Sequence, residues 1–514
     1  MRDGVQEMLL SRLSDMIAVH VGLHFPRERW HDLKRGISSA AKDFGFDNVE
    51  SCIQWLVSSS LTRNQIEILA SNLTIGETYF FRDKRIFEIL EEHIIPELIS
   101  LRRTSERRLR IWSAGCATGE EPYSIAILLK KMIPDLRDWN ITLLATDINP
   151  RFLQKASKGA YTDWSFRGTP RWVREGYFGK IKTNLYQISS DVKEMVTFSF
   201  LNLVRDSYPS LVNNTNAVDI IFCRNVLMYF ATGTMHKVIQ KLYRSLVDGG
   251  WLIVSPCETS NTLASQFTAV NFPGTILYRK VLNPSGIPGK IFRENVLTGE
   301  EEQETGISFQ IPFEPVDDIT DGMTVQRFTV CIDEENKKPE VPEPKDPYME
   351  ILDIYRKGLY REAGEKLITF LSDRKVIGNN PAFTREPVDL LIHVYANQGK
   401  LHEALEWCEK AITMDKTNPC FHYLRANILQ ELGHVEESVI SLKRVLYLNP
   451  DFVLAHFALG MLNRKKGKIR EANRHFKNAL SILDSFRDDD VLPESEGMTA
   501  KRLREIIVST MEGI

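Results

Sequence analysis

A 34-residue period near the C-terminus is the feature that most constrains how this chain folds. Gly399, Gly433 and Gly467 lie 34 residues apart. Two further ladders keep the same spacing: Ala404, Ser438 and Ala472, and then Ala411, Val445 and Ala479. A period of this length accommodates two helices and a turn, and stacked copies bury a continuous core. The pattern predicts an all-α solenoid over residues 347–484.

The solenoid has a first copy and a candidate cap. The first copy contains Gly358 and Ala363, and Gly358 lies 41 residues before Gly399, which is one period plus seven. We therefore expect four repeats, with an insertion near GNNPAFTREP. The final stretch, 485–514, contains the amphipathic TAKRLREIIVSTM, which predicts a C-terminal capping helix.

Residues 1–84 carry helical patterns. Apolar residues recur at three- and four-residue spacing, at Met8, Leu9, Leu13, Ile17 and Val21. A second helix is expected after Pro26 and a third near Ser51. The pattern predicts an N-terminal helical bundle.

Residues 85–283 alternate strand and helix patterns. Four short apolar runs are each expected to form a strand: LRIW (109–112), ITLLAT (141–146), DIIFC (219–223) and WLIVSP (251–256). Strands that alternate with helices predict a parallel sheet covered on both faces. Polar and apolar residues alternate over 179–201, which predicts a small antiparallel β insertion.

The stretch 284–346 differs from its surroundings. It holds 7 of the 22 prolines, and its 15 acidic and 6 basic residues leave it strongly negative. Its end, EENKKPEVPEPKDP, has no apolar period. We interpret 284–346 as an acidic, proline-containing linker, with an isolated strand considered at Arg327–Ile332.

Composition excludes several classes of protein. The chain has 65 basic and 68 acidic residues, whereas dedicated nucleic-acid binders carry a basic excess. No apolar run approaches the roughly 18 residues that a membrane-spanning helix needs. We expect neither a nucleic-acid partner nor membrane insertion. The seven cysteines are scattered without metal-type spacing, which predicts no metal site and a reduced, cytoplasmic protein.

The loop after the first predicted strand, SAGCATGEEPYSIA, is the first candidate ligand site. Gly115 and Gly119 bracket a turn that opens a helix, and such a turn brings backbone N–H groups close to a ligand. The acids Glu120 and Glu121 repel a pyrophosphate but suit a ligand with hydroxyls and a positive charge, such as S-adenosylmethionine. Two plainer interpretations stay open: the glycines only form a turn, and one acid only favours the helix N-terminus.

Polar residues at other strand ends extend this candidate site. Asp147 ends the second strand, where an acid commonly accepts hydrogen bonds from ribose hydroxyls; a helix N-cap is the alternative. The motif RNVLMYF places three residues at the same carboxyl edge: Arg224, Asn225 and Tyr229. Thr78 and Arg82 are four apart and are predicted to share a helical face, although Arg82 could equally form a domain-bridging ion pair.

Together these motifs resemble the chemotaxis-receptor glutamate O-methyltransferase family (CheR-type). The resemblance covers about residues 10–282 and follows, in order, GLHFPRERW, LTIGETYFFR, IWSAGCATGEEPYSIA, ATDIN, GAY, FLNLV, DIIFCRNVLMYF and GGWLIVSPCET. It implies a multidomain protein, with a Rossmann-like class I methyltransferase domain of α/β type after the helical bundle. The C-terminal solenoid resembles tetratricopeptide repeats, which a branch of this family carries.

The resemblance also implies roles for particular residues. The cofactor would be S-adenosylmethionine, bound by Thr78, Arg82, Glu121, Asp147, Asn202, Leu203, Arg224 and Asn225. Arg82 and Tyr229 would act in catalysis. The substrate would be glutamate side chains in the signalling domain of a methyl-accepting chemoreceptor, and the repeats would bind a further, unidentified protein.

Two departures from the family pattern bear on these roles. Many members carry Asn where this chain has Gly76, so that side chain's cofactor contact is missing here. The region YFGKIKTNLYQISSDVKEMVTF is shorter than in members that tether to a receptor tail, and it lacks their glycine pair. We therefore expect docking through the repeats instead. The alternatives are a non-catalytic scaffold that senses S-adenosylmethionine, and a methyltransferase with a different substrate.

Overall fold

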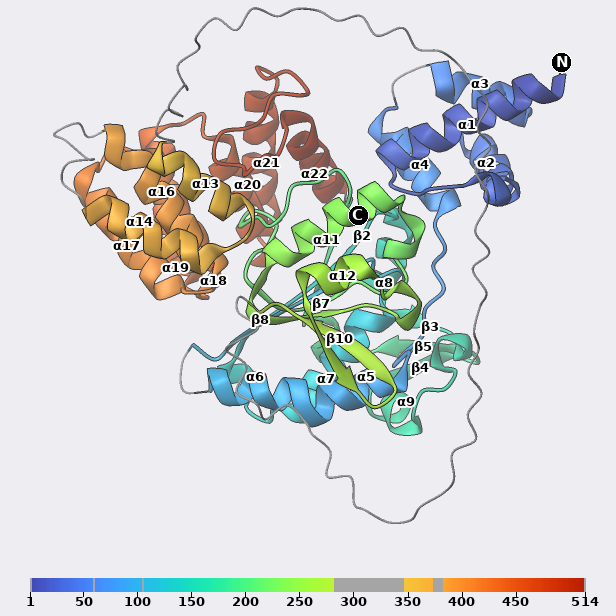
Figure 1. Ribbon diagram of the computed structural model, residues 1–514, viewed down its shortest axis with the longest axis horizontal. Coiled ribbons are helices and arrows are strands. Elements are labelled where there is room, and N and C mark those ends of the chain that lie inside the picture. Colours follow the sequence, from blue (N-terminus) through green and yellow to red (C-terminus); the bar gives the residue numbers. More distant parts are fainter. Residues whose placement is uncertain (1, 59–60, 104–105, 282–345, 373–381, 513–514) are drawn as a thin grey trace, which may run out of the picture. The chain divides into compact units, whose positions relative to one another are not determined.

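The N-terminal region is a bundle of four helices. The computed structural model describes residues 2–58, 61–103, 106–281, 346–372 and 382–512 (Figure 1). The first helices are α1 (Arg2–His20), α2 (Trp30–Asp43), α3 (Val49–Ser58) and α4 (Arg63–Leu73), with a 3₁₀ turn, η1 (Arg27–Arg29), before α2. Leu13, Ile17 and Leu33 are buried in a shared core, as the three- and four-residue spacing predicts.

The centre of the molecule is a seven-stranded sheet in the order β6-β2-β1-β7-β8-β10-β9. Its strands are β1 (Arg108–Ala114), β2 (Asn140–Asp147), β6 (Val196–Phe200), β7 (Val218–Phe222), β8 (Leu246–Ile253), β9 (Thr268–Phe272) and β10 (Thr275–Arg279). The first five in spatial order pair in parallel, and the β9–β10 hairpin adds an antiparallel edge. All four apolar runs of the sequence are strands of this sheet.

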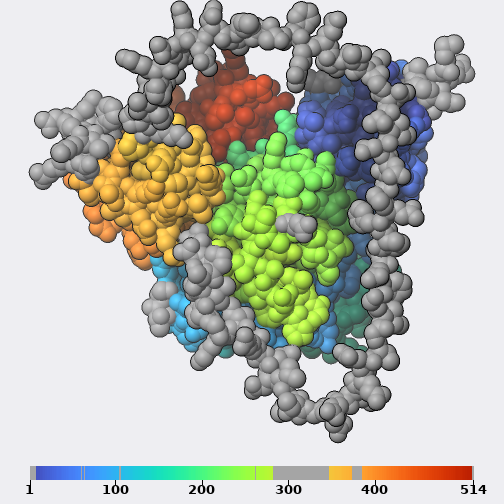
Figure 2. Space-filling view, in the orientation of Figure 1, coloured from blue at the N-terminus to red at the C-terminus, as the bar shows by residue number. Residues whose placement is uncertain are grey.

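Helices cover both faces of the sheet. They are α5 (Lys84–Ile89), η2 (Leu90–Ile94), α6 (Ile95–Arg102), α7 (Glu120–Met132), α8 (Pro150–Lys158), α9 (Arg171–Tyr177), α10 (Ser190–Lys193), α11 (Thr232–Ser245) and α12 (Asn261–Gln266). Successive β1 side chains alternate between two cores: Leu109 and Ile111 pack with α5–α7, whereas Trp112 packs with α11 and α12. Figure 2 shows the green and yellow-green atoms of this part of the chain on the face of the molecule turned toward the viewer.

Three short strands between β2 and β6 in the sequence form a small second sheet. It is antiparallel, in the order β3-β5-β4, with β3 (Ala160–Tyr161), β4 (Phe178–Lys182) and β5 (Leu185–Ile188). The range 179–201 assigned from the sequence needs correction, because β6 pairs in parallel with β2 in the main sheet. Alternation alone does not tell which sheet a strand joins, because β6, at the edge of the main sheet, also alternates between more and less exposed residues.

The described part of the C-terminal region contains four helix pairs and a final helix. They are α13 (Pro347–Arg356) with α14 (Tyr360–Ser372), α16 (Ala382–Asn397) with α17 (Leu401–Met414), α18 (Pro419–Glu431) with α19 (Val435–Leu448), α20 (Val453–Lys465) with α21 (Ile469–Leu483), and α22 (Ala500–Glu512). Gly399, Gly433 and Gly467 occupy the turns within pairs, with φ of 74°, 85° and 73°. Only glycine adopts such angles without cost, which explains the ladder. Leu503 and Ile507 of α22 pack into the core of the last repeats.

Three expectations lie wholly or partly outside the described residues. The predicted linker lies outside the described residues except for Asp346, and the strand considered at Arg327–Ile332 lies wholly outside them. The insertion near GNNPAFTREP is described only from residue 382 onward. Residues 1–282 and 347–514 form one compact unit, and the domain boundaries within it stay predictions. In the described ranges, no helix is both long and apolar enough to cross a membrane.

Candidate functional site

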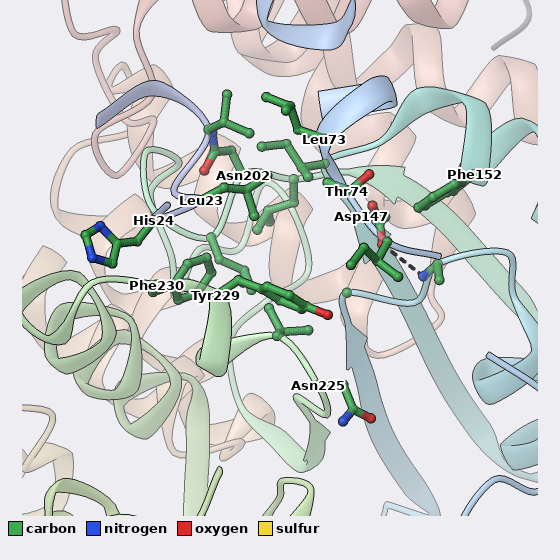
Figure 3. A pocket seen from close by; sticks show the side chains of 18 of the residues that line it. Leu23, His24, Leu73, Thr74, Asp147, Phe152, Asn202, Asn225, Tyr229 and Phe230 are labelled. Carbon is green, nitrogen blue, oxygen red and sulfur yellow. Dashed lines mark hydrogen bonds between the residues drawn. The ribbon is translucent and has the colours of Figure 1, made fainter. Parts of the chain in front are cut away.

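Two neighbouring cavities lie where β1, β2 and β7 end. The inner cavity is lined by Asp147, Asn202, Leu203, Asn225 and Tyr229, together with residues of the N-terminal helices (Figure 3). It holds about 810 Å³ of space between its lining atoms, including the part open to solvent. The outer cavity shares Asn225 and Tyr229 with it and adds Thr78, Arg82, Glu121 and Arg224. Every residue to which the resemblance gives a cofactor-binding or catalytic role therefore lines at least one of the two cavities.

The loop after β1 comes close to its neighbours because of its glycines. Gly115 and Gly119 have φ of 84° and 93°, and an added Cβ would lie 2.4 Å from Val226 and 2.8 Å from Ala156. Gly115 donates its backbone N–H to Thr146 O, which ties the loop to the end of β2. The glycines are thus required both by conformation and by space.

Asp147 presents a buried carboxylate at the wall of the inner cavity. Only 8% of the residue is exposed. Its Oδ1 accepts from the backbone N–H of Asn149 at 2.8 Å, and its Oδ2 from that of Ala117 at 2.9 Å. Burial raises the pKa of Asp147 to about 6, against the opposing effect of these N–H groups. The N-cap of α8 is Asn149, so the capping alternative for Asp147 is wrong.

The two acids of the GEE motif have different surroundings. Glu120 is buried and accepts hydrogen bonds from the hydroxyls of Thr118 and Ser165 within the protein. Glu121 instead borders the outer cavity, where it accepts from Ser113 Oγ and pairs with Arg224 at 3.1 Å. Of the two acids, only Glu121 lines one of the two cavities.

Arg224 is held by two carboxylates. Its side chain is 2% exposed and pairs with Asp83 as well as with Glu121. Sequence reasoning did not find Asp83, which precedes α5 and lies 141 residues from Arg224. Arg224 thus joins Glu121 to Asp83, and the charged side chains that line the outer cavity, Glu77, Glu121, Arg82 and Arg224, balance one another.

Asn202 and Leu203 line the inner cavity in a turn after β6. The amide of Asn202 is engaged within the protein: Nδ2 donates to His20 O, and Oδ1 accepts from Val204 N. Leu203 O accepts from the hydroxyl of Tyr208. These bonds fix the turn between the sheet and the end of α1, so both residues shape the cavity wall.

Thr78 and Arg82 meet in the outer cavity, but not on a helix. They lie in the segment between α4 and α5, so the predicted shared helical face is wrong. Arg82 donates to Glu77 O at 2.7 Å and lies 5.8 Å from the ring centre of Tyr79. The hydrogen bond lies within its own loop, unlike the domain-bridging pair considered from the sequence.

Tyr229 is shared by both cavities and by the N-terminal helices. Its backbone O accepts from His24 N at 2.7 Å, and the guanidinium of Arg29 lies 5.9 Å from its ring centre. Burial raises the pKa of its hydroxyl, which stays protonated at neutral pH. Tyr229 can therefore donate a hydrogen bond into the outer cavity.

Sequence reasoning missed other lining residues. Leu23 and Phe25 come from GLHFPRERW, and Phe152 follows the ATDIN motif. Phe230 ends RNVLMYF, a motif that was noticed without assigning this residue. Their common signal is an aromatic or apolar residue inside a motif, which sequence alone does not distinguish from core packing.

The donor set fits S-adenosylmethionine. The inner cavity is lined by Gly115, by the buried carboxylate of Asp147, which can accept hydrogen bonds from hydroxyls, and by an apolar wall. The outer cavity carries both acidic and basic side chains, so charged groups of either sign on the cofactor can find an opposite charge there. In addition, Arg224 Nε is buried without a hydrogen-bond partner in the described part of the chain.

Comparisons with known proteins show the family to which this chain belongs. The family model "CheR methyltransferase, SAM binding domain" matches residues 76–276, and a tetratricopeptide repeat model matches 393–418 and 421–452. A chemotaxis protein methyltransferase of Borreliella burgdorferi is 32% identical over 49% of this chain and 87% of its own length. A probable chemotaxis protein methyltransferase of Rhizobium etli is 33% identical over 43% and 81%. The chain therefore belongs to the CheR methyltransferase family.

Proposed function

We propose that this S-adenosylmethionine-dependent methyltransferase acts on glutamate side chains in the signalling domain of a methyl-accepting chemoreceptor. The observation that carries the proposal is the outer cavity, where Arg82 and Tyr229 border the space next to the cavity of Asp147. A cation and a protonated hydroxyl suit a carboxylate substrate. The relatives are named chemotaxis protein methyltransferases, which supports this substrate class.

S-adenosylmethionine supplies an activated methyl group on a sulfonium. The attacking glutamate is already ionised at neutral pH, since its reference pKa is about 4.3, so no general base is required. In the reaction a carboxylate oxygen forms the new O–C bond while the C–S bond breaks. The products are a neutral ester and a neutral thioether.

The protein's own residues align and desolvate these charges. Asp147 accepts hydrogen bonds from sugar hydroxyls. Arg82 and Tyr229 orient the substrate carboxylate, and positioning of this kind supplies several kcal/mol in favourable cases. One guanidinium nitrogen of Arg82 donates to Glu77 O, which holds the side chain in place and leaves its other N–H groups for the substrate carboxylate.

The repeats would bind a second protein, as solenoids of this type commonly do. We place the reaction in the cytoplasm, where receptor signalling domains and S-adenosylmethionine meet. Esterification removes a negative charge from a receptor helix, and such a change shifts helix packing.

The test uses the full chain, methyl-labelled cofactor and membranes that contain the host's receptors. We expect label on receptor-sized protein, released as methanol by mild base, because carboxyl esters are base-labile. Arg82→Ala serves as the inactive control. Base-stable label would point to a different substrate group, and absence of label would overturn the proposal in favour of a non-catalytic scaffold.

A further inference from the structure

Gly76 lies against a neighbouring aromatic ring, and a side chain at this position would clash with that ring. Its φ lies outside the left-handed region, so its backbone conformation is open to any residue. A Cβ at this position would lie 2.5 Å from Cζ of Phe152, and 2.8 Å and 2.9 Å from its two Cε atoms. All three nearest atoms belong to one ring, so the constraint is steric and comes from Phe152.

Phe152 lies at a functionally important place in the wall of the inner cavity. It is in the first turn of α8, where its backbone N–H donates to the N-cap Asn149. The same Asn149 donates its backbone N–H to Asp147, so a short chain of hydrogen bonds links the ring's backbone to the buried carboxylate. Figure 3 shows Phe152 at the end of the cavity where Asp147 lies.

We propose that Phe152 is a cofactor-binding residue of this chain, paired with Gly76. Its ring takes the space that a side chain at position 76 would fill and packs against the sugar of S-adenosylmethionine beside Asp147. The ring also keeps water from one side of the carboxylate that holds the sugar hydroxyls.

Four proteins test the pairing: the unchanged chain, Gly76→Asn, Phe152→Val, and the double variant. The measurement is the Kd for S-adenosylhomocysteine by titration calorimetry, which needs no turnover. We expect Phe152→Val to weaken binding about three- to tenfold through lost apolar contact. We expect Gly76→Asn to weaken binding about tenfold or more, because the ring must leave the wall.

The double variant decides between pairing and independence. Val at position 152 leaves room for Asn at position 76. We therefore expect the double variant to bind about fivefold or more tightly than the product of the two single losses predicts, as is typical of residues in contact. Gly179→Asn is the matched control, since nothing lies within 4 Å of a Cβ there, and we expect unchanged affinity. If Gly76→Asn does not fold, Gly76→Ala, which adds the Cβ alone, replaces it in the cycle. Multiplicative effects would overturn the pairing, and unchanged affinity of Phe152→Val would overturn the cofactor contact.

Discussion

At the residue scale, Arg82 and Asp147 line different cavities, and we propose that the first orients the substrate and the second binds the cofactor. Arg82 borders only the outer cavity, and its hydrogen bond stays within its own loop. Asp147 borders only the inner cavity and is held by two backbone N–H groups. Substitutions at the two positions should therefore change different steps.

We expect Arg82→Ala to lower kcat by about 100-fold or more, the range seen when one orienting donor is removed from an active site. The Kd for S-adenosylhomocysteine should change little, because the inner cavity keeps its lining. Steady-state kinetics and calorimetry on the same preparation check both statements, with Arg82→Lys as the charge-preserving control. Equal losses of affinity and turnover would contradict the assignment.

The raised pKa of Asp147 predicts a pH dependence of cofactor binding. Below about pH 6 the carboxylate takes up a proton and becomes a weaker acceptor for sugar hydroxyls. Affinity for S-adenosylhomocysteine should therefore be roughly tenfold lower at pH 5 than at pH 7.5. Native stability should change in the opposite direction, since ionising a buried acid with a raised pKa works against folding as pH rises. Calorimetry measures this affinity across the pH range. For Asp147→Asn we expect a weak affinity that does not change with pH. An affinity that still falls toward acid pH in this variant would show that another group causes the pH dependence.

At the element scale, the loop that follows β7 depends on a carboxylate from the end of β8. Glu258 is buried, and its oxygens accept from the backbone N–H groups of Asn225 at 2.7 Å, Val226 at 2.7 Å and Met228 at 3.3 Å. Asn225 itself has a positive φ of 57°, which needs such support. One acid thus shapes the loop that carries Asn225 and Tyr229.

We expect Glu258→Ala to reduce both stability and cofactor affinity. It leaves four backbone N–H groups, those of Asn225, Val226, Met228 and Ser255, without this acceptor, at a cost of about 1–3 kcal/mol for each that finds no water. Thermal unfolding with and without S-adenosylhomocysteine measures the two effects. Glu258→Gln, which keeps one acceptor oxygen, should be intermediate. Wild-type affinity in a destabilised Glu258→Ala protein would show that the loop does not need this anchor.

At the scale of the whole molecule, a buried charge network joins the repeats to the sheet. Glu431 at the end of α18 lies 3.1 Å from Arg110 and 4.0 Å from Arg108, and all three side chains are only 3% exposed. Asn216 adds a hydrogen bond to Glu431 at 2.9 Å. Arg108 begins β1, whereas the Gly115 loop follows its end, so the network and the site occupy opposite ends of one strand. Burial lowers the pKa of Arg108, and the nearby acids oppose this shift.

Removing Glu431 should destabilise the whole protein, because it leaves two arginines buried without this counter-charge. For Glu431→Ala we expect a loss of about 3–5 kcal/mol in the free energy of unfolding. Urea denaturation followed by circular dichroism measures it. Glu436→Ala, which removes an exposed partner of Lys466 on the next helix, is the control and should leave the midpoint unchanged. A midpoint for Glu431→Ala that matches this control would show that the network does not hold the repeats.

The sequence by itself determined the features that repeat locally or follow a short motif. The 34-residue ladder predicted the helix pairs because each turn needs a glycine with positive φ. The four apolar runs predicted the central strands, and the motifs at their ends predicted which residues gather at one edge. The roles of those residues stay predictions, since their positions alone do not measure what they bind.

Tertiary structure decided the contacts between residues far apart in the chain. The strand β6 pairs within the main sheet, Asp83 is the second partner of Arg224, and Glu431 is a partner of Arg110. The ring of Phe152 likewise explains the glycine at position 76. These contacts leave no period and no spacing in the sequence, because each depends on how separate elements pack together in three dimensions.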